Sequence, residues 1–160
     1  MRPLVVVEGR PARLDDARGE LLAVGWSVSS APRAGDVLEI VVADDASAAD
    51  AVLSAVAGQG LLVEATAHRA VVDRLCDDLR RLGRLDHRVE AGPVLSLDQH
   101  ALLGLLAAGT TLGAAAERLH LSRRSADRRL AGARDVLGAD STPAALAAWQ
   151  RRLAQVPRPD

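Results

Sequence analysis

Hydrophobic residues in the first half of the chain fall either in short continuous runs or at helical spacing. Short apolar runs predict buried strands, whereas apolar residues three or four positions apart predict helices. The runs predict strands at 4–7, 26–29, 37–43, 61–66 and 85–90, and the helical spacings predict helices at 12–24, 47–57 and 67–82. Because strands and helices alternate, we expect a parallel sheet and an α/β fold for this half.

The second half of the chain shows only helical spacing. Apolar pairs predict one helix that ends before Gly109, and further helices are expected at 111–119, after Ser122, and from 143 to about 153. Ser122 has the chemistry of an N-cap, because its hydroxyl can accept from free amides of the next turn. In the helix that follows, one face is apolar, and the other carries charged side chains. The apolar positions are Ala126, Leu130, Ala133 and Leu137, and the charged positions include Arg124, Asp127 and Arg128.

Charge is divided unevenly between these two parts of the chain. Residues 1–92 carry 11 Arg against 15 Asp and Glu, and residues 93–160 carry 9 Arg against 6. Gly92-Pro93 is the expected boundary between an acidic regulatory or dimerisation domain and a basic domain, which is typical of a regulator attached to a nucleic-acid-binding module.

Composition narrows the cellular setting and the chemistry. A single cysteine, Cys76, excludes an internal disulfide and a cysteine-based zinc site. No apolar run has the length of a membrane span, and the N-terminus lacks the pattern of a secretory signal, so we expect a cytoplasmic protein without a membrane partner. The four histidines show no metal spacing, and no phosphate-binding glycine loop is present. We therefore expect no metal, no cofactor and no enzymatic activity.

The motifs from Leu95 onward resemble the DNA-binding domain of LuxR/NarL-type transcription regulators. The family pattern Leu-Thr, then Leu-Leu-Ala-x-Gly, corresponds to Leu95-Ser96 and to 105–109. The family's Leu-x-Ile-Ser-x-x-Thr-Val corresponds to 119–126, and its Leu-Gly-Val corresponds to 137–139. The match covers about 60 residues at nearly constant spacing. It implies an all-α four-helix domain over 93–160, with a helix-turn-helix.

This resemblance implies a sequence-specific regulator that binds double-stranded DNA. Thr111, Arg123 and Arg124 would contact phosphates, and Asp127 and Arg128 would reach base edges in the major groove. The fourth helix would pair two copies into a homodimer that reads a pseudo-palindromic site. The sequence departs from the family pattern: the scaffold helix lacks the family's glutamate, and Asp127 replaces a lysine. The alternative interpretation of the helix after Ser122 is an ordinary amphipathic helix with a solvated charged face.

The order of elements in 1–92 resembles the receiver domain of two-component regulators, in truncated form. Asp44 would stand near the phosphoacceptor, Thr66 near the switch residue, and Glu8 at the acidic cation site. The chemistry is incomplete, because Glu8 is a single carboxylate where a receiver uses an acidic pair for Mg²⁺, and the chain has no lysine. We therefore expect a degenerate, phosphorylation-independent module. Asp44 is alternatively a cap of the following helix.

A second function class also fits these observations. The helix-turn-helix could be retained as a fold while DNA binding is lost, and the protein would then regulate through a partner such as RNA polymerase or another regulator. The arginine face distinguishes the two hypotheses, because a protein-binding relic need not keep Arg123, Arg124 and Arg128 together.

Overall fold

A parallel sheet of strands in the order β2-β3-β4-β1-β5 forms the centre of the N-terminal half. The computed structural model describes residues 1–89 and 91–160. The strands are β1 (Leu4–Val7), β2 (Val28–Ser29), β3 (Val37–Val42), β4 (Gly60–Ala65) and β5 (Leu85–Arg88). The helices are α1 (Pro11–Ala23), α2 (Asp45–Val56), α3 (Arg69–Leu82), α4 (Leu97–Ala107), α5 (Leu112–Arg118), α6 (Arg123–Leu137) and α7 (Thr142–Leu153).

Strand side chains alternate between two hydrophobic clusters, one on each face of the sheet. Val6 of β1 and Val63 of β4 pack beneath α2 and α3, in a cluster that includes Leu75 and Leu79 of α3. The neighbouring strand residues point to the other face, where they pack against α1. This second cluster includes Val5, Val7 and Leu62 from the strands, and Leu14, Ala17 and Leu21 from α1. The sheet is therefore covered on both faces, as continuous apolar strands require.

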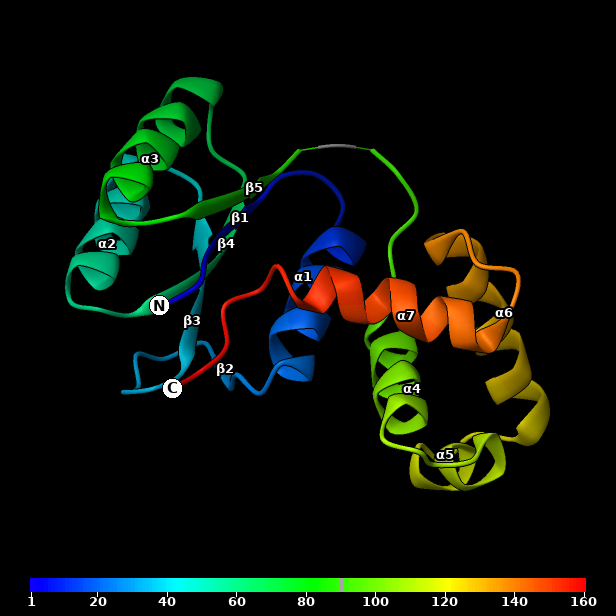
Figure 1. Cartoon of the computed structure of the whole chain (residues 1–160). Coiled ribbons are helices and arrows are strands. Elements are labelled where there is room, and N and C mark those ends of the chain that lie inside the picture. The colour runs from blue at the N-terminus through cyan, green and yellow to red at the C-terminus, as the bar shows by residue number, and fades with distance from the viewer. Residues whose placement is uncertain (90) are drawn as a thin grey trace.

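Helices α4 to α7 form a further layer on the outer side of α1 (Figure 1). Their shared cluster contains Leu102, Leu103, Leu130 and Trp149. Val24, just after α1, packs against both this cluster and the cluster between the sheet and α1. After α7 the chain returns to the sheet (Figure 1), where the indole nitrogen of Trp26 donates to the carbonyl of Pro157 at 2.6 Å. The two halves are thus packed together through α1 and the C-terminal segment.

Predicted and observed elements agree closely in position. The ends of the predicted strands and helices lie within two residues of the observed ones at most positions, with β2 two residues shorter than expected and α2 beginning at Asp45 rather than Ser47. The strand expected at 85–90 ends at Arg88 in the structure, and its last predicted residue, Glu90, lies outside the described residues.

The expected arrangement of these elements is wrong. We expected a truncated receiver-like α/β domain followed by a separate all-α four-helix LuxR-type domain. The described residues instead form a single α/β domain of seven helices around one all-parallel five-stranded sheet, and 160 residues are too few for a receiver plus a four-helix helix-turn-helix domain. The strand order also differs: a receiver places its first strand between the second and third, in the order 2-1-3-4-5, whereas β1 lies between β4 and β5 here.

Close contact between α1 and α4 depends on Gly19. This residue is buried in α1, and a Cβ atom placed on it would lie 2.3 Å from Cδ2 of His100 on α4. Glycine in a helix interior costs roughly 0.5–1 kcal/mol relative to alanine. Its presence at this position is explained by the approach of the imidazole ring.

We predict that Gly19→Ala lowers the free energy of unfolding by about 1–3 kcal/mol, because overpacking outweighs the gain in helix propensity. Gly113→Ala is the matched control, since its Cβ would meet its nearest neighbour at 3.7 Å, an ordinary contact. Urea denaturation of both variants measures the effect. A Gly19→Ala protein as stable as Gly113→Ala would contradict this account of the contact.

Candidate functional site

A four-residue turn joins α5 to α6. The turn is 119–122, and His120 adopts the left-handed conformation with φ 54°. The amide of Leu121 donates to the carbonyl of Ala116 at 2.8 Å, which closes the end of α5 in the manner of a Schellman motif. The Ser122 hydroxyl then accepts from the amide of Ser125 at 3.1 Å and caps α6. A helix-turn-helix joins its two helices by a turn of three or four residues, and the turn between α5 and α6 has this length.

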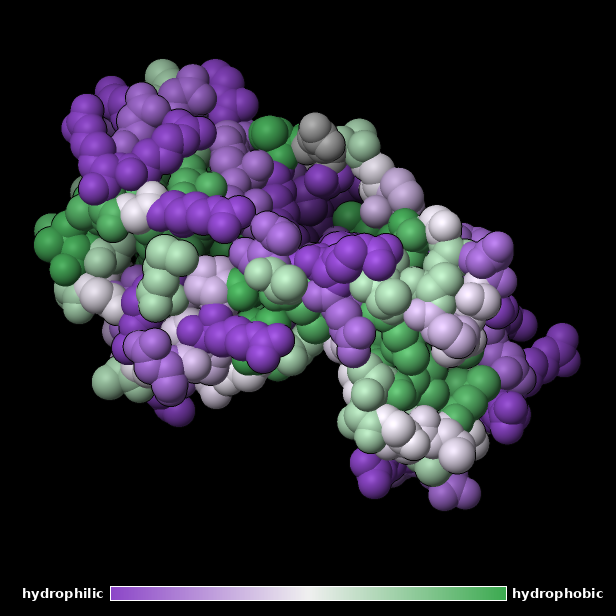
Figure 2. Space-filling model, in the orientation of Figure 1, coloured by the Kyte–Doolittle hydropathy of each residue, from purple (hydrophilic) through white to green (hydrophobic). Residues whose placement is uncertain are grey.

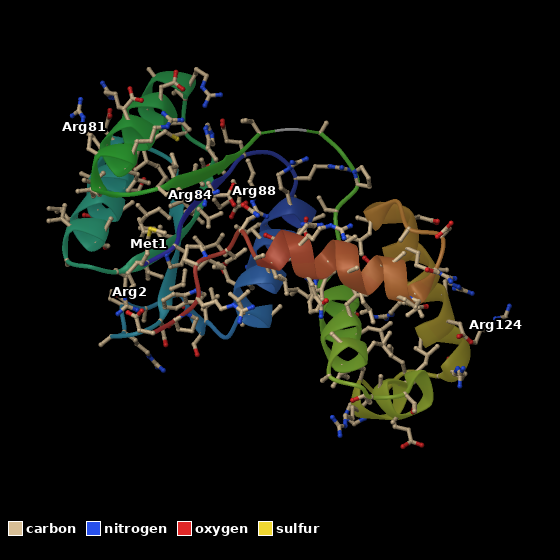
Figure 3. All side chains as sticks on the ribbon, viewed as in Figure 1. Met1, Arg2, Arg81, Arg84, Arg88 and Arg124 are labelled. Carbon is tan, nitrogen blue, oxygen red and sulfur yellow. The ribbon has the colours of Figure 1, made fainter. Side chains whose placement is uncertain are left out.

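One side of α6 is buried in the helical layer, and the other is open to solvent. Ala126, Leu130 and Ala133 are buried, which matches the apolar face predicted from their spacing. Arg124 and Arg128 are exposed, and Figure 3 shows Arg124 extending away from the ribbon of α6. The buried face thus packs within the helical layer, and the charged face is left open to solvent.

Of the five predicted DNA-contacting residues, four lie on α6, and Thr111 precedes α5 as its N-cap. Arg123, Arg124, Asp127 and Arg128 are exposed side chains in the first two turns of α6. The Thr111 hydroxyl accepts from the amide of Ala114 at 3.2 Å as the N-cap of α5, and its hydroxyl hydrogen is still available to a phosphate oxygen. Asp127 lies 3.6 Å from Nε of Arg123, so part of the positive charge at the start of α6 is offset.

The three residues of the expected vestigial phosphoacceptor site each follow one of three neighbouring parallel strands. Glu8 follows β1 and Asp44 follows β3, and β4 lies between those strands. Asp44 instead caps α2, with the amide of Ser47 donating to its carboxylate at 2.8 Å. The Thr66 hydroxyl faces the carbonyl of Val42 at 3.4 Å.

Glu8 is engaged by two basic side chains. Arg69 and His87 contact its Oε2 at 2.9 and 2.6 Å. Although burial raises the pKa of Glu8, these contacts lower it below its ordinary value overall. Because the sheet does not have the strand order of a receiver, the fold does not support a cation site at Glu8 or a phosphoacceptor at Asp44.

A buried polar network, which the sequence did not indicate, connects α1 to α4 and α7. The indole nitrogen of Trp149 donates to Nδ1 of His100 at 3.0 Å, and Nε2 of His100 lies 2.7 Å from Oδ1 of Asp16. Since an indole N–H can only donate, Nδ1 must accept, and the ring proton is on Nε2, where it is donated to Asp16. His100 and Asp16 are 3% and 5% exposed.

The network continues from α1 to the edge of the sheet through two arginines. Arg152 of α7 bonds Asp16 at 2.9 Å and also Glu20, which is 4% exposed. Arg88 of β5 bonds Glu20 at 2.5 Å and Asp86 at 2.7 Å. Burial raises the pKa of Asp16, but hydrogen bonds from His100 and Arg152 and the charge of Arg152 bring it below its ordinary value. The Asp16 carboxylate is therefore held ionised inside the protein.

A cleft of about 660 Å³ lies beside this network, between the sheet edge and the C-terminal segment. We call it the interlayer cleft. Hydrophilic residues gather between the sheet and the helical layer in Figure 2. The walls of the interlayer cleft include Val5 and Arg88 from the sheet, Arg13 from α1, and Arg152 and Val156 from the C-terminal end. The interlayer cleft was not predictable from the sequence, because its walls come from both ends of the chain and from residues 84–94.

Within the described ranges, no group of three or more His, Cys, Asp or Glu side chains is arranged to hold a metal ion. The part of the chain that the structure describes also contains no helix both long enough and apolar enough to span a bilayer.

We predict that Asp16→Asn lowers the free energy of unfolding at pH 7 by about 2–3 kcal/mol, because it leaves charged partners without their counterion. The pKa of Asp16 is depressed on folding, so its contribution is present above the unfolded pKa of about 4 and is lost as the pH falls through the lower folded value. The difference between the wild-type protein and Asp16→Asn should therefore shrink below pH 4. Urea denaturation from pH 7 to pH 2 measures it.

Asp77→Asn is the control, because Asp77 forms an exposed pair with Arg80 whose loss should cost less than about 1 kcal/mol. Parallel stability curves for the wild-type protein and Asp16→Asn across this pH range would show that Asp16 is not a source of acid sensitivity.

Comparison with known proteins adds no family to these observations: no protein-family model matches the chain, and no curated protein is found to be similar to it.

Proposed function

We propose that the protein is a cytoplasmic, sequence-specific DNA-binding regulator of transcription, with α6 as its recognition helix. The observation that carries the proposal is the exposed arginine face at the start of α6, presented by a capped helix after a four-residue turn. An α-helix with this form fits the width of the major groove, and arginine is the side chain that most often reads guanine.

Charge near the helix start supports binding to a polyanion. Arg118, Arg123, Arg124 and Arg128 are exposed on α5 and the first turns of α6, where the exposed acids are Glu117 and Asp127. Asp135, near the end of α6, is a third exposed acid. The excess of exposed arginines over exposed acids is modest, so general affinity for DNA should be weak and strongly dependent on salt. Asp127 can accept a hydrogen bond from a cytosine amino group, which would add sequence preference at that position.

Two copies acting together would compensate for the small contact surface of one recognition helix. We expect a homodimer that reads a pseudo-palindromic site. One face of α7 already makes contacts within the chain, because Trp149 bonds His100 of α4 and Arg152 bonds Asp16 of α1. A partner copy at α7 would therefore meet its opposite face, where Pro143, Ala147 and Gln150 are exposed.

The experiment is a selection of genomic DNA fragments by the full-length chain at 50 and 200 mM salt, followed by sequencing. Enrichment of one palindromic motif, with weaker recovery at the higher salt, is the expected result. Recovery of no motif at either salt would contradict the proposal and favour the alternative, a helix-turn-helix that acts through a partner protein.

On the enriched site, we predict that Arg128→Ala lowers affinity by about 1–3 kcal/mol and relaxes the base preference at one position of each half-site. Fluorescence anisotropy with the enriched duplex and with single-base variants measures both effects. Arg81→Ala is the matched control, because Arg81 is an exposed arginine on α3, on the far side of the sheet. Unchanged affinity and preference in Arg128→Ala would rule out a base contact by this residue.

A further inference from the structure

The interlayer cleft has the size and lining of a small-molecule site. Its volume of about 660 Å³ lies within the range of ligand pockets, about 300–1,000 Å³. Sites of this kind combine apolar walls with a few converging polar groups. Here the apolar walls come from Val5 of β1, Leu21 of α1, Val94 before α4 and Val156 after α7.

The charged groups in the cleft favour an anion. Four arginines line it, namely Arg13, Arg84, Arg88 and Arg152, against three carboxylates, namely Asp16, Glu20 and Asp86. All three carboxylates are already bonded to Arg88 or Arg152. Neither Arg13 nor Arg84 forms an ion pair with a described residue. Arg13 lies near Gly9, past the end of β1, whereas Arg84 lies level with the start of β1. Arg84 is therefore the cation that we assign to a ligand.

We propose that the interlayer cleft binds a small amphipathic carboxylic acid, with its carboxylate at Arg84 and its apolar body against Val94 and Val156. A guanidinium fork matches the two oxygens of a carboxylate. The apolar walls distinguish such a ligand from a purely ionic one such as inorganic phosphate.

A ligand in this cleft would touch both layers of the protein. Its walls combine β5 and α1 with residues 91–94 and the segment after α7. Arg88 and Arg152 in those walls belong to the polar network that ends at Trp149. Trp26 bonds the carbonyl of Pro157, which also lines the cleft. Both tryptophans of the chain are therefore placed to report occupancy by their fluorescence.

The test is calorimetric titration of the full chain with acetate, butyrate, octanoate and inorganic phosphate, and tryptophan fluorescence provides a second readout. We expect one site per chain for octanoate, with affinity rising about fourfold for each methylene added. Arg84→Glu should weaken octanoate binding at least tenfold, and Arg81→Glu, the matched exposed control on α3, should leave it unchanged (Figure 3).

Three results would overturn the proposal. They are the absence of octanoate binding, phosphate binding as tightly as octanoate, and equal binding by the Arg84→Glu and Arg81→Glu variants. Because Arg84 is exposed and has no ion pair with a described residue, its substitution should not unfold the protein, and circular dichroism of both variants checks this. The titration involves no DNA, so its outcome is independent of the proposed DNA binding.

Discussion

The buried contact between Asp16 and His100 is the interaction on which the arrangement of the two layers depends. It joins α1, the helix that covers the sheet, to α4, the first helix of the layer that contains α6. A buried carboxylate is stable only where its charge is compensated. Arg152 supplies that compensation from α7, and Glu20 and Arg88 extend the network to the sheet. The relative position of the two layers is thus fixed by hydrogen bonds of defined direction as well as by apolar packing.

This arrangement explains why the chain is one α/β domain rather than two modules. The apolar cluster between the sheet and α1 meets the cluster within α4–α7 at Val24. The C-terminal segment returns to the sheet, where Pro157 accepts a hydrogen bond from Trp26. Because α1 packs against both layers, the face that carries Asp16 and Glu20 is also internal. Gly19 allows the imidazole of His100 to approach that face. The interlayer cleft lies where this packing stops, at the edge strand β5.

Local structure was predictable from the sequence because it depends on periodicity and capping, which are properties of neighbouring residues. The strand at Leu4–Val7 and the cap at Ser122 follow from such patterns. Sheet order was not predictable, because it depends on which strands meet after the helices have crossed the sheet. Asp16 and Glu20 resembled the solvated face of an ordinary helix, and their partners Arg88, His100 and Arg152 lie 68 to 136 positions away along the chain.

For the candidate site, the sequence indicated the exposed face of α6 but not the cleft. The alternation of Ala126, Leu130 and Ala133 with arginines is visible in a single segment. The receiver resemblance rested on the order of elements along the chain and on a few residues such as Glu8 and Asp44. That order does not determine how the strands are arranged in the sheet, and the observed arrangement is not that of a receiver.

The most direct test of the central claim, that α6 enters the major groove, is cleavage of DNA from a tethered reagent. The only cysteine of the chain, Cys76, is buried, so Glu117→Cys provides a single accessible thiol for an iron chelate next to α6. On the duplex enriched by selection, the account predicts strand cleavage confined to two positions related by the symmetry of the site. Diffuse cleavage, or the same pattern from a chelate at Arg81→Cys on α3, would contradict it.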